Sequence, residues 1–256
     1  MGEFTLASDN YELRGWLREP ARGTGPFPCI LLCHGIPSGQ PAEPGDLGYP
    51  ALLERVAGRG LACIYFNFRG TGDSQGDFSF RGWLRDLEAV ADAVLNGIEP
   101  FQDIDMGRLG ILAFSGGAAV SIDFAARHHH FQAIASMASP ADLTELMPRE
   151  NLAEILAHWK DIGLIRDPGF PPDADQFYRE LKDLSPLRHV AWVAPTPLLI
   201  VHGELDDLVP VYAAHQLFEA AGEPKELRVL PGAGHKLRLV PEAVEGALDW
   251  LQERLG

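Results

Sequence analysis

Short apolar runs alternate with longer segments of helical period along most of the chain. A continuous apolar run bounded by turn residues is typical of a strand buried on both faces, as in parallel sheets. Residues 4–7 and 11–17, separated by Ser8-Asp9-Asn10, predict an antiparallel hairpin before the first such run. The apolar runs lie at residues 29–33, 61–66, 109–114, 133–137, 197–201 and 227–230.

Helical periodicity fills the intervals between these runs. The clearest case is residues 80–95, where apolar side chains recur every three to four positions and Ser79 is placed to cap the first turn. Alternating strands and helices predict an α/β protein with a mainly parallel, doubly wound sheet of about eight strands. The other predicted helices of this body are residues 52–56, 118–126, 211–221 and 243–251.

One segment interrupts the alternation. Residues 140–188 contain helical patterns at 152–159 and 174–184 and no convincing strand. Neither an internal repeat nor a low-complexity linker divides the chain. We therefore expect a single domain, residues 1–256, with a helical lid at 140–188 inserted between the strands at 133–137 and 197–201.

Composition and charge exclude several classes of protein. The 256 residues are 46% hydrophobic and 22% charged, which is typical of a soluble globular chain. A net charge of −15 disfavours nucleic acid and anionic membrane surfaces as partners. No apolar run approaches the roughly 20 residues of a membrane span. In Met1–Thr5 no basic segment precedes an apolar core, so we expect no secretory signal.

The cysteines favour a reducing compartment. Cys29, Cys33 and Cys63 form neither a disulfide framework nor a zinc-type spacing with histidines. We expect a cytoplasmic protein without a metal or a cofactor. The sequence leaves the oligomeric state open, a homodimer included.

A serine between a strand and a helix is the strongest chemical signal. Residues 109–114 run directly into Ser115, followed by Gly116, Gly117 and a helix of small residues. Such a tight turn raises a serine hydroxyl above the sheet edge, and the first amide of the helix can stabilise an oxyanion. The usual pattern is Gly-x-Ser-x-Gly, and this chain has Ala113 at the first glycine position.

A carboxylate and a histidine follow the serine along the chain. Asp206 and Asp207 lie just after the strand at 197–201, and His235 lies in a glycine-rich loop after the final strand. A serine becomes a nucleophile when a base takes its proton and a carboxylate orients that base. The chain order Ser, Asp, His is that of α/β-hydrolases.

Taken together, these motifs resemble the α/β-hydrolase superfamily over nearly the whole chain, in particular its dienelactone-hydrolase and prolyl-oligopeptidase-like branches. His34-Gly35-Ile36-Pro37 resembles the oxyanion loop, and residues 202–210 resemble the acid loop. The resemblance implies Ser115 as nucleophile, His235 as general base and acid, and Asp206 as the orienting carboxylate. It also implies an oxyanion hole formed by the amides of Ile36 and Gly116.

Other residues compete for some of these roles. Asp207 is adjacent to Asp206, and Asp142 follows the strand at 133–137, where some relatives carry the acid. His34 and His202 precede glycines at strand ends, and we expect them to hold loops by hydrogen bonds. Arg69 and Asp73 are expected to brace their own loop, and His128-His129-His130 to form a solvated helix end.

The expected reaction is ester hydrolysis. Apolar residues dominate the segment 140–188, and a mostly apolar cap over a serine site favours an apolar acyl or alcohol group. We expect a carboxylesterase that cleaves small to medium uncharged esters, with Gly35, Phe114, Trp159 and Leu208 lining the substrate pocket. The alternatives are a peptidase or amidase, a thioesterase or lactonase, and a non-catalytic ligand-binding member of the fold.

Overall fold

The centre of the protein is one eight-stranded sheet, described by a computed structural model over residues 1–43 and 45–256. The strand order is β1-β2-β4-β3-β5-β6-β7-β8. The first two strands form the predicted hairpin and pair antiparallel, as do β2 and β4, whereas all other neighbours are parallel. The predicted fold class is therefore confirmed. The strands are β1 (Gly2–Ser8), β2 (Tyr11–Arg18), β3 (Phe27–Cys33), β4 (Ala62–Phe66), β5 (Ile104–Phe114), β6 (Ala133–Met137), β7 (Leu198–Gly203) and β8 (Lys225–Leu230).

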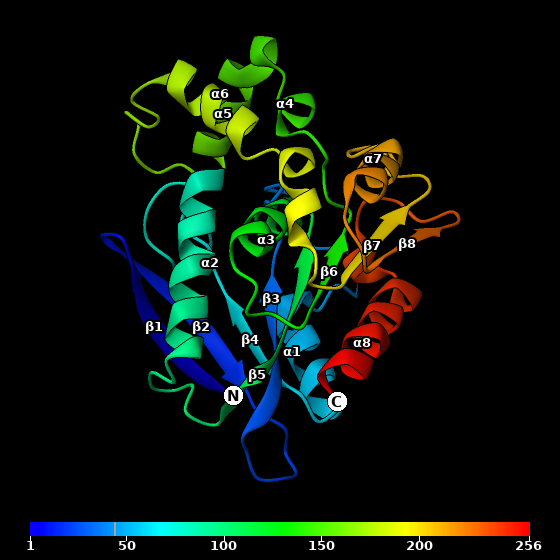
Figure 1. Ribbon diagram of the computed structural model, residues 1–256. Coiled ribbons are helices and arrows are strands. Elements are labelled where there is room, and N and C mark those ends of the chain that lie inside the picture. The colour runs from blue at the N-terminus through cyan, green and yellow to red at the C-terminus, as the bar shows by residue number, and fades with distance from the viewer. Residues whose placement is uncertain (44) are drawn as a thin grey trace.

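Helices cover both faces of the sheet (Figure 1). One face packs on α2 (Phe80–Leu95), α3 (Gly116–Arg127) and α7 (Tyr212–Ala220), and the other on α1 (Gly48–Gly58) and α8 (Pro241–Leu255). Successive side chains of a strand point to opposite faces, so one buried strand contributes to both cores. In β3, Leu31 packs in the core under α2 and α3, while its neighbours Ile30 and Leu32 pack in the core under α1 and α8.

Local signals explain where two of these elements begin. Ser79 caps α2 as expected, because its hydroxyl accepts the Gly82 N–H at 3.0 Å. Strand β5 begins at Ile104 rather than at residue 109. The apolar run begins only at residue 109 because the first part of the strand carries polar residues. The Asp105 carboxylate accepts the Gly107 N–H at 2.9 Å and pairs with Arg108 at 2.7 Å.

Residues 140–188 form helices above the carboxyl ends of the parallel strands (Figure 1). The Phe78 N–H donates to the Leu164 carbonyl at 3.0 Å, and the Arg166 guanidinium donates to two carbonyls of the loop after β4. The segment is thus fastened to the body through the C-terminal side of α5. Its elements are α4 (Leu143–Leu146), α5 (Leu152–Asp161), α6 (Ala174–Asp183) and 3₁₀ turns at Arg149–Asn151 and Pro186–Arg188, followed by another at Val190–Val193.

Two further features concern the helices and the cysteines. The helices of residues 1–43 and 45–256 include none with the length and apolarity needed to cross a bilayer. Cys29, Cys33 and Cys63 are buried and carry free thiols.

Candidate active site

Ser115 occupies the sharp turn between β5 and α3. Its backbone has φ +51° and ψ −119°, a left-handed conformation that costs a non-glycine residue about 1–3 kcal/mol. The Ser115 N–H donates to the Met137 carbonyl at 2.8 Å, which ties the turn to β6. A side chain at Gly117 would place Cβ 2.2 Å from the His34 carbonyl oxygen, so only glycine lets α3 start this close to the loop after β3. The strain is therefore maintained by packing on both sides of Ser115.

His235 joins Ser115 to Asp206. Its Nδ1 lies 2.7 Å from Asp206 Oδ2, and its Nε2 lies 3.0 Å from Ser115 Oγ. A carboxylate only accepts hydrogen bonds, so the proton of the neutral imidazole is on Nδ1. The Nε2 lone pair then faces the serine hydroxyl and can accept its proton.

The loop after β7 and the loop after β8 meet closely to make this contact. A Cβ at Gly203 would lie 2.4 Å from the Ala233 carbonyl oxygen, so glycine is required where β7 ends. The Leu205 N–H donates to the same carbonyl at 2.8 Å. These contacts hold the segment that carries Asp206 against the segment that carries His235.

Four N–H groups surround the Asp206 carboxylate. Oδ1 accepts the backbone N–H of Leu208 at 3.0 Å and of Val209 at 2.8 Å, and Oδ2 lies 3.2 Å from His202 Nε2 in addition to His235. Burial by itself would raise the pKa of Asp206, but the hydrogen bonds from His202, His235 and Val209 hold it well below its ordinary value. The carboxylate is therefore ionised at neutral pH.

The two other candidate acids lie elsewhere. Asp207 is exposed, and no hydrogen bond joins it to His235 in the described part of the chain. Asp142 caps α4, where its carboxylate accepts from Thr144 and from the Ser185 hydroxyl at 2.9 Å. Of the three carboxylates, the structure brings Asp206 to the histidine.

The loop after β3 lies directly against Ser115. A Cβ at Gly35 would lie 3.0 Å from Ser115 Cβ, and one at Gly116 would lie 2.8 Å from Ile36 Cγ1. Within residues 1–43 and 45–256, the backbone N–H groups of Ile36 and Gly116 have no hydrogen-bond acceptor. Two free amides at the edge of Ser115 suit the stabilisation of an oxyanion.

His34 and His202 hold loops, as predicted. His34 Nδ1 donates to the Gly35 carbonyl at 2.7 Å, and its Nε2 accepts the Phe68 N–H at 3.2 Å. Both ring nitrogens are thus satisfied in the neutral form, and complete burial lowers the pKa of His34 to about 4. His202 donates through Nε2 to the Val209 carbonyl at 2.7 Å, within the acid loop.

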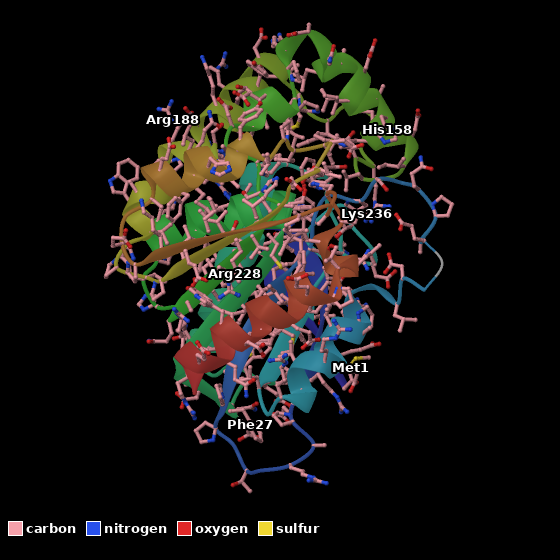
Figure 2. The ribbon with its side chains drawn as sticks, turned by 90° about the vertical axis from the view of Figure 1, so that its right-hand side faces the viewer. Met1, Phe27, His158, Arg188, Arg228 and Lys236 are labelled. Atoms are coloured by element: carbon pink, nitrogen blue, oxygen red, sulfur yellow. The ribbon has the colours of Figure 1, made fainter. Side chains whose placement is uncertain are left out.

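Two residues near the site carried no sequence signal. The Tyr49 hydroxyl accepts the Gly35 N–H at 3.1 Å, and the Arg238 guanidinium lies over the Tyr49 ring at 5.1 Å from its centroid. Neither belongs to a motif of fixed spacing, because their partners are distant in the chain. Figure 2 labels Lys236, which follows His235 and marks the same loop, below the helices of residues 140–188.

The residues predicted to line a pocket occupy different environments. Gly35 and Phe114 adjoin Ser115, and Leu208 is 56% exposed beside Asp206. Trp159 is buried, with its ring 4.7 Å from Phe78 and 6.5 Å from Phe177. Trp159 therefore fastens α5 to the body, and its contribution to a pocket stays a prediction.

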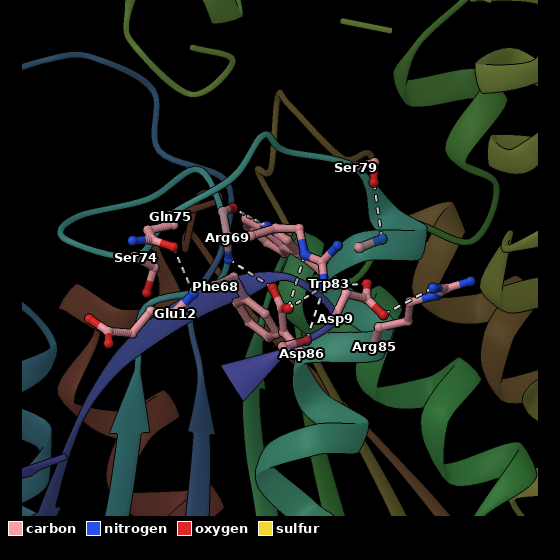
Figure 3. A network of polar contacts seen from close by, with 12 residues as sticks. Asp9, Glu12, Phe68, Arg69, Ser74, Gln75, Ser79, Trp83, Arg85 and Asp86 are labelled. Atoms are coloured by element: carbon pink, nitrogen blue, oxygen red, sulfur yellow. Dashed lines mark hydrogen bonds and ion pairs between the residues drawn. The ribbon is translucent and has the colours of Figure 1, made fainter. Parts of the chain in front are cut away.

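Arg69 belongs to a separate polar network (Figure 3). Its guanidinium donates to Asp86 at 2.7 and 2.9 Å and to Asp9 at 3.0 Å, and its carbonyl accepts the Trp83 indole N–H at 3.0 Å. This network ties the hairpin, the loop after β4 and α2 together, as expected of a residue that braces its own loop. The described residues contain no cluster of His, Cys, Asp and Glu suited to a metal ion.

The fold and the motifs of this site define a serine hydrolase of the α/β-hydrolase superfamily. The model of the prolyl oligopeptidase family matches residues 50–256, most of the chain. The chain belongs to this family.

The chain is also similar to curated proteins and to solved structures. The uncharacterized protein Rv2307c of Mycobacterium tuberculosis is 31% identical over 240 residues, which cover 93% of this chain and 72% of that protein. A monoacylglycerol lipase of Mycolicibacterium smegmatis is 27% identical over an alignment that covers 91% of this chain and 90% of that protein. The α/β-hydrolase GrgF from Penicillium sp. sh18 shares the fold with a TM-score of 0.74 at 23% identity, over 99% of this chain and 98% of that one.

Proposed function

We propose that the protein is a carboxylesterase that cleaves small to medium uncharged esters through an acyl-enzyme on Ser115. The observation that carries the proposal is the unbroken chain from Ser115 Oγ through His235 to Asp206, with distances of 3.0 and 2.7 Å. Nucleophile, base and orienting carboxylate are within hydrogen-bond reach, in the tautomer that general-base catalysis needs.

Acylation follows from this geometry. Ser115 Oγ attacks the ester carbonyl while His235 Nε2 takes the hydroxyl proton, and the Ile36 and Gly116 amides stabilise the tetrahedral oxyanion. The imidazolium then gives its proton to the leaving alkoxide, which departs as the alcohol. In deacylation His235 takes a proton from water, the hydroxide attacks the acyl-enzyme, and Ser115 Oγ leaves with that proton.

The rim of the site supports an uncharged, apolar substrate. Leu205 and Leu208 flank Asp206 and are 65% and 56% exposed. Lys236 and Arg238, the cations nearest His235 in sequence, pair with Glu43 and Asp46. Exposed Asp207 has no cationic partner among the described residues, so the rim disfavours an anionic substrate. The similarity to a monoacylglycerol lipase also favours ester substrates.

We propose in addition that residues 140–188 act as a lid. The segment lies above the carboxyl ends of the strands (Figure 1), and α4 reaches α7 through a hydrogen bond of 2.8 Å from the Tyr212 hydroxyl to Glu145. A cover of this kind limits which acyl or alcohol groups enter the site and excludes water from the reaction.

The family includes peptidases by its description, so an amide substrate is the second candidate. A panel of nitrophenyl esters of rising acyl length, measured beside aminoacyl anilides, separates the two. We expect higher kcat/KM for uncharged esters than for anilides, and lower values for esters with a carboxylate on the acyl group. Faster cleavage of anilides would contradict the carboxylesterase proposal and favour a peptidase.

A further inference from the structure

Two separate loops supply the chemistry proposed above. Residues 34–36 follow β3 and present the Ile36 amide, whereas residues 235–238 follow β8 and present His235. The two loops are far apart in sequence, yet the base and the oxyanion hole must keep a fixed distance from the same serine. The first turn of α1 contacts both loops.

Tyr49, in that first turn, fixes the oxyanion loop. Its hydroxyl accepts the Gly35 N–H at 3.1 Å, while His34 Nδ1 donates to the Gly35 carbonyl at 2.7 Å. The carbonyl and N–H of one trans peptide point in opposite directions, so a fixed Gly35 carbonyl also fixes the direction of the Ile36 N–H. Tyr49 therefore holds the Gly35 N–H from outside the loop, and the neighbouring His34 holds the Gly35 carbonyl from within it.

The Tyr49 ring is itself held in a stack of aromatic side chains. It lies parallel to Tyr65 at a centroid distance of 5.4 Å and an angle of 8°, and Tyr65 stacks on Trp16 at 5.5 Å. The ring edge also meets Phe114, the residue before Ser115, at 5.8 Å. These contacts leave the hydroxyl little freedom to leave Gly35.

Arg238 fixes the other loop to the same turn. Its Nη2 donates to Asp46 Oδ2 at 2.6 Å, its Nη1 donates to Oδ1, and its guanidinium lies over the Tyr49 ring. Asp46 Oδ1 also accepts the Gly48 N–H at 2.8 Å, where α1 begins. The side chains of Asp46 and Arg238 are only 8% and 20% exposed, so this bidentate pair is shielded from solvent.

Lys236 and Leu237 alone separate His235 from Arg238 in the loop after β8. The Leu237 N–H donates to the His235 carbonyl at 2.8 Å, and a 3₁₀ turn spans Leu237–Leu239. Because few bonds separate the histidine from the arginine, anchoring Arg238 restricts the position of the imidazole.

We propose that Tyr49, Arg238 and Asp46 form a loop clamp that positions the Ile36 amide and the His235 imidazole on one side-chain cluster. They are positioning residues, because their described hydrogen bonds and ion pair are with the two loops and the start of α1, and Tyr49 packs in addition on Tyr65 and Phe114. The proposal rests on the carboxylesterase function proposed above, and it adds specific residues that set the rate.

Tyr49→Phe tests the oxyanion half of the loop clamp. It deletes one hydroxyl and leaves the Gly35 N–H without its acceptor, so kcat should fall roughly tenfold with KM nearly unchanged. The affinity for a trifluoromethyl ketone, which forms a tetrahedral adduct on Ser115, should fall by a similar factor. A general loss of folding would not move kcat and this affinity together while sparing KM.

Tyr65→Phe is the matched control. It removes the same atom from the next ring of the stack, where the hydroxyl donates to Asn67 at 2.9 Å and not to either loop. We expect its kcat and its affinity for the ketone to stay within about twofold of wild type. Equal effects of the two Tyr→Phe changes on kcat would overturn the role of Tyr49.

Arg238→Gln tests the other half. This variant should lower kcat several-fold, and Arg238→Lys should recover part of the loss. Arg228→Gln is the control and should have little effect on kcat, because Arg228 pairs with Glu226 on β8. The double variant Tyr49→Phe, Arg238→Gln should lose less than the product of the single losses, since both act on one cluster. Fully multiplicative losses would contradict a shared loop clamp.

Failure of the loop clamp and failure of the proposed function give different results. Wild-type protein that cleaves esters, with Tyr49 and Arg238 variants indistinguishable from their controls, overturns the loop clamp alone. Wild-type protein that neither cleaves esters nor reacts with a fluorophosphonate overturns both.

Discussion

Two fully buried carboxylates, Asp206 and Asp86, are satisfied in opposite ways. Asp86 accepts hydrogen bonds from the guanidinium of Arg69 at 2.7 and 2.9 Å and from its backbone N–H at 2.8 Å, so a permanent cation neutralises it (Figure 3). Asp206 accepts from two backbone amides and two imidazoles, and no arginine or lysine touches it among the described residues.

The difference shows how one residue type serves two purposes. The positive charge of Arg69 compensates the negative charge of Asp86, so the role of Asp86 is to fix the positions of neighbouring residues. At Asp206 the charge is stabilised by dipoles alone, and the unmatched charge can favour a proton arriving on His235. Of these two buried carboxylates, the one beside His235 and Ser115 is therefore the one that lacks a cationic partner.

The largest effect should come from Ser115→Ala. Ester turnover should fall by at least ~10⁴-fold, because the oxyanion amides alone cannot replace the nucleophile. Alanine is no more hindered than serine at φ +51°, so the thermal midpoint should change little. Initial-rate assays and thermal unfolding of the purified variant measure both quantities. Residual turnover near the wild-type value would remove Ser115 from the mechanism.

Asp206→Asn should follow, with kcat reduced by about 10⁴-fold. The amide can donate to His235 Nδ1 and so favours the tautomer that cannot accept the serine proton at Nε2. Asp207→Asn is the matched control and should keep kcat within about twofold of wild type, since Asp207 is exposed. Equal losses in the two variants would contradict the assignment of Asp206.

Arg69→Met should affect stability rather than rate. It leaves Asp86 buried without its cation, which should lower the free energy of unfolding by about 3–5 kcal/mol. Urea unfolding measures this change, and ester hydrolysis at a temperature where the variant is folded should remain within a few-fold of wild type. A loss of kcat as large as that of Asp206→Asn would erase the distinction between the two carboxylates.

His34 should give the smallest effect, visible in the pH dependence of stability. Its pKa of about 4 in the folded protein lies below the ordinary value of about 6.5, so the unfolded chain binds the proton first as pH falls. This contribution is complete above about pH 6.5 and is lost as pH falls toward about 4, with about 2 kcal/mol gone near pH 5.

Urea unfolding of wild type and His34→Gln at about pH 7.5 and about pH 5 isolates this contribution. The decrease between the two pH values should be about 2 kcal/mol smaller in the variant. An identical decrease in both proteins would show that His34 already binds a proton in the folded state.

Patterns of apolar residues anticipated most of the fold. Buried strands such as residues 29–33 and 133–137 are apolar on both faces and bounded by turn residues, so the local sequence is enough to locate them. Strand β5 starts early because Ile104 pairs with Phe27 of β3, and no apolar pattern marks this stretch, since Asp105 and Arg108 are polar and bond to each other.

The residues of the candidate active site likewise fall into those that sequence motifs indicate and those that they do not. Ser115 and Asp206 lie near Gly117 and Gly203, which close backbone approach requires, and His235 lies in a glycine-rich loop, so sequence indicates all three. Tyr49 and Arg238 meet the loops only through tertiary contacts, the hydroxyl on Gly35 and the ion pair with Asp46. No spacing along the chain marks such contacts.

Labelling with a fluorophosphonate tests directly whether His235 and Asp206 activate Ser115. The reagent reacts with a serine only when a base has activated its hydroxyl, and peptide mass spectrometry locates the adduct. We expect one adduct per chain, on Ser115, with labelling abolished in Ser115→Ala and strongly slowed in Asp206→Asn. No adduct at neutral pH, or an adduct on another residue, would contradict it.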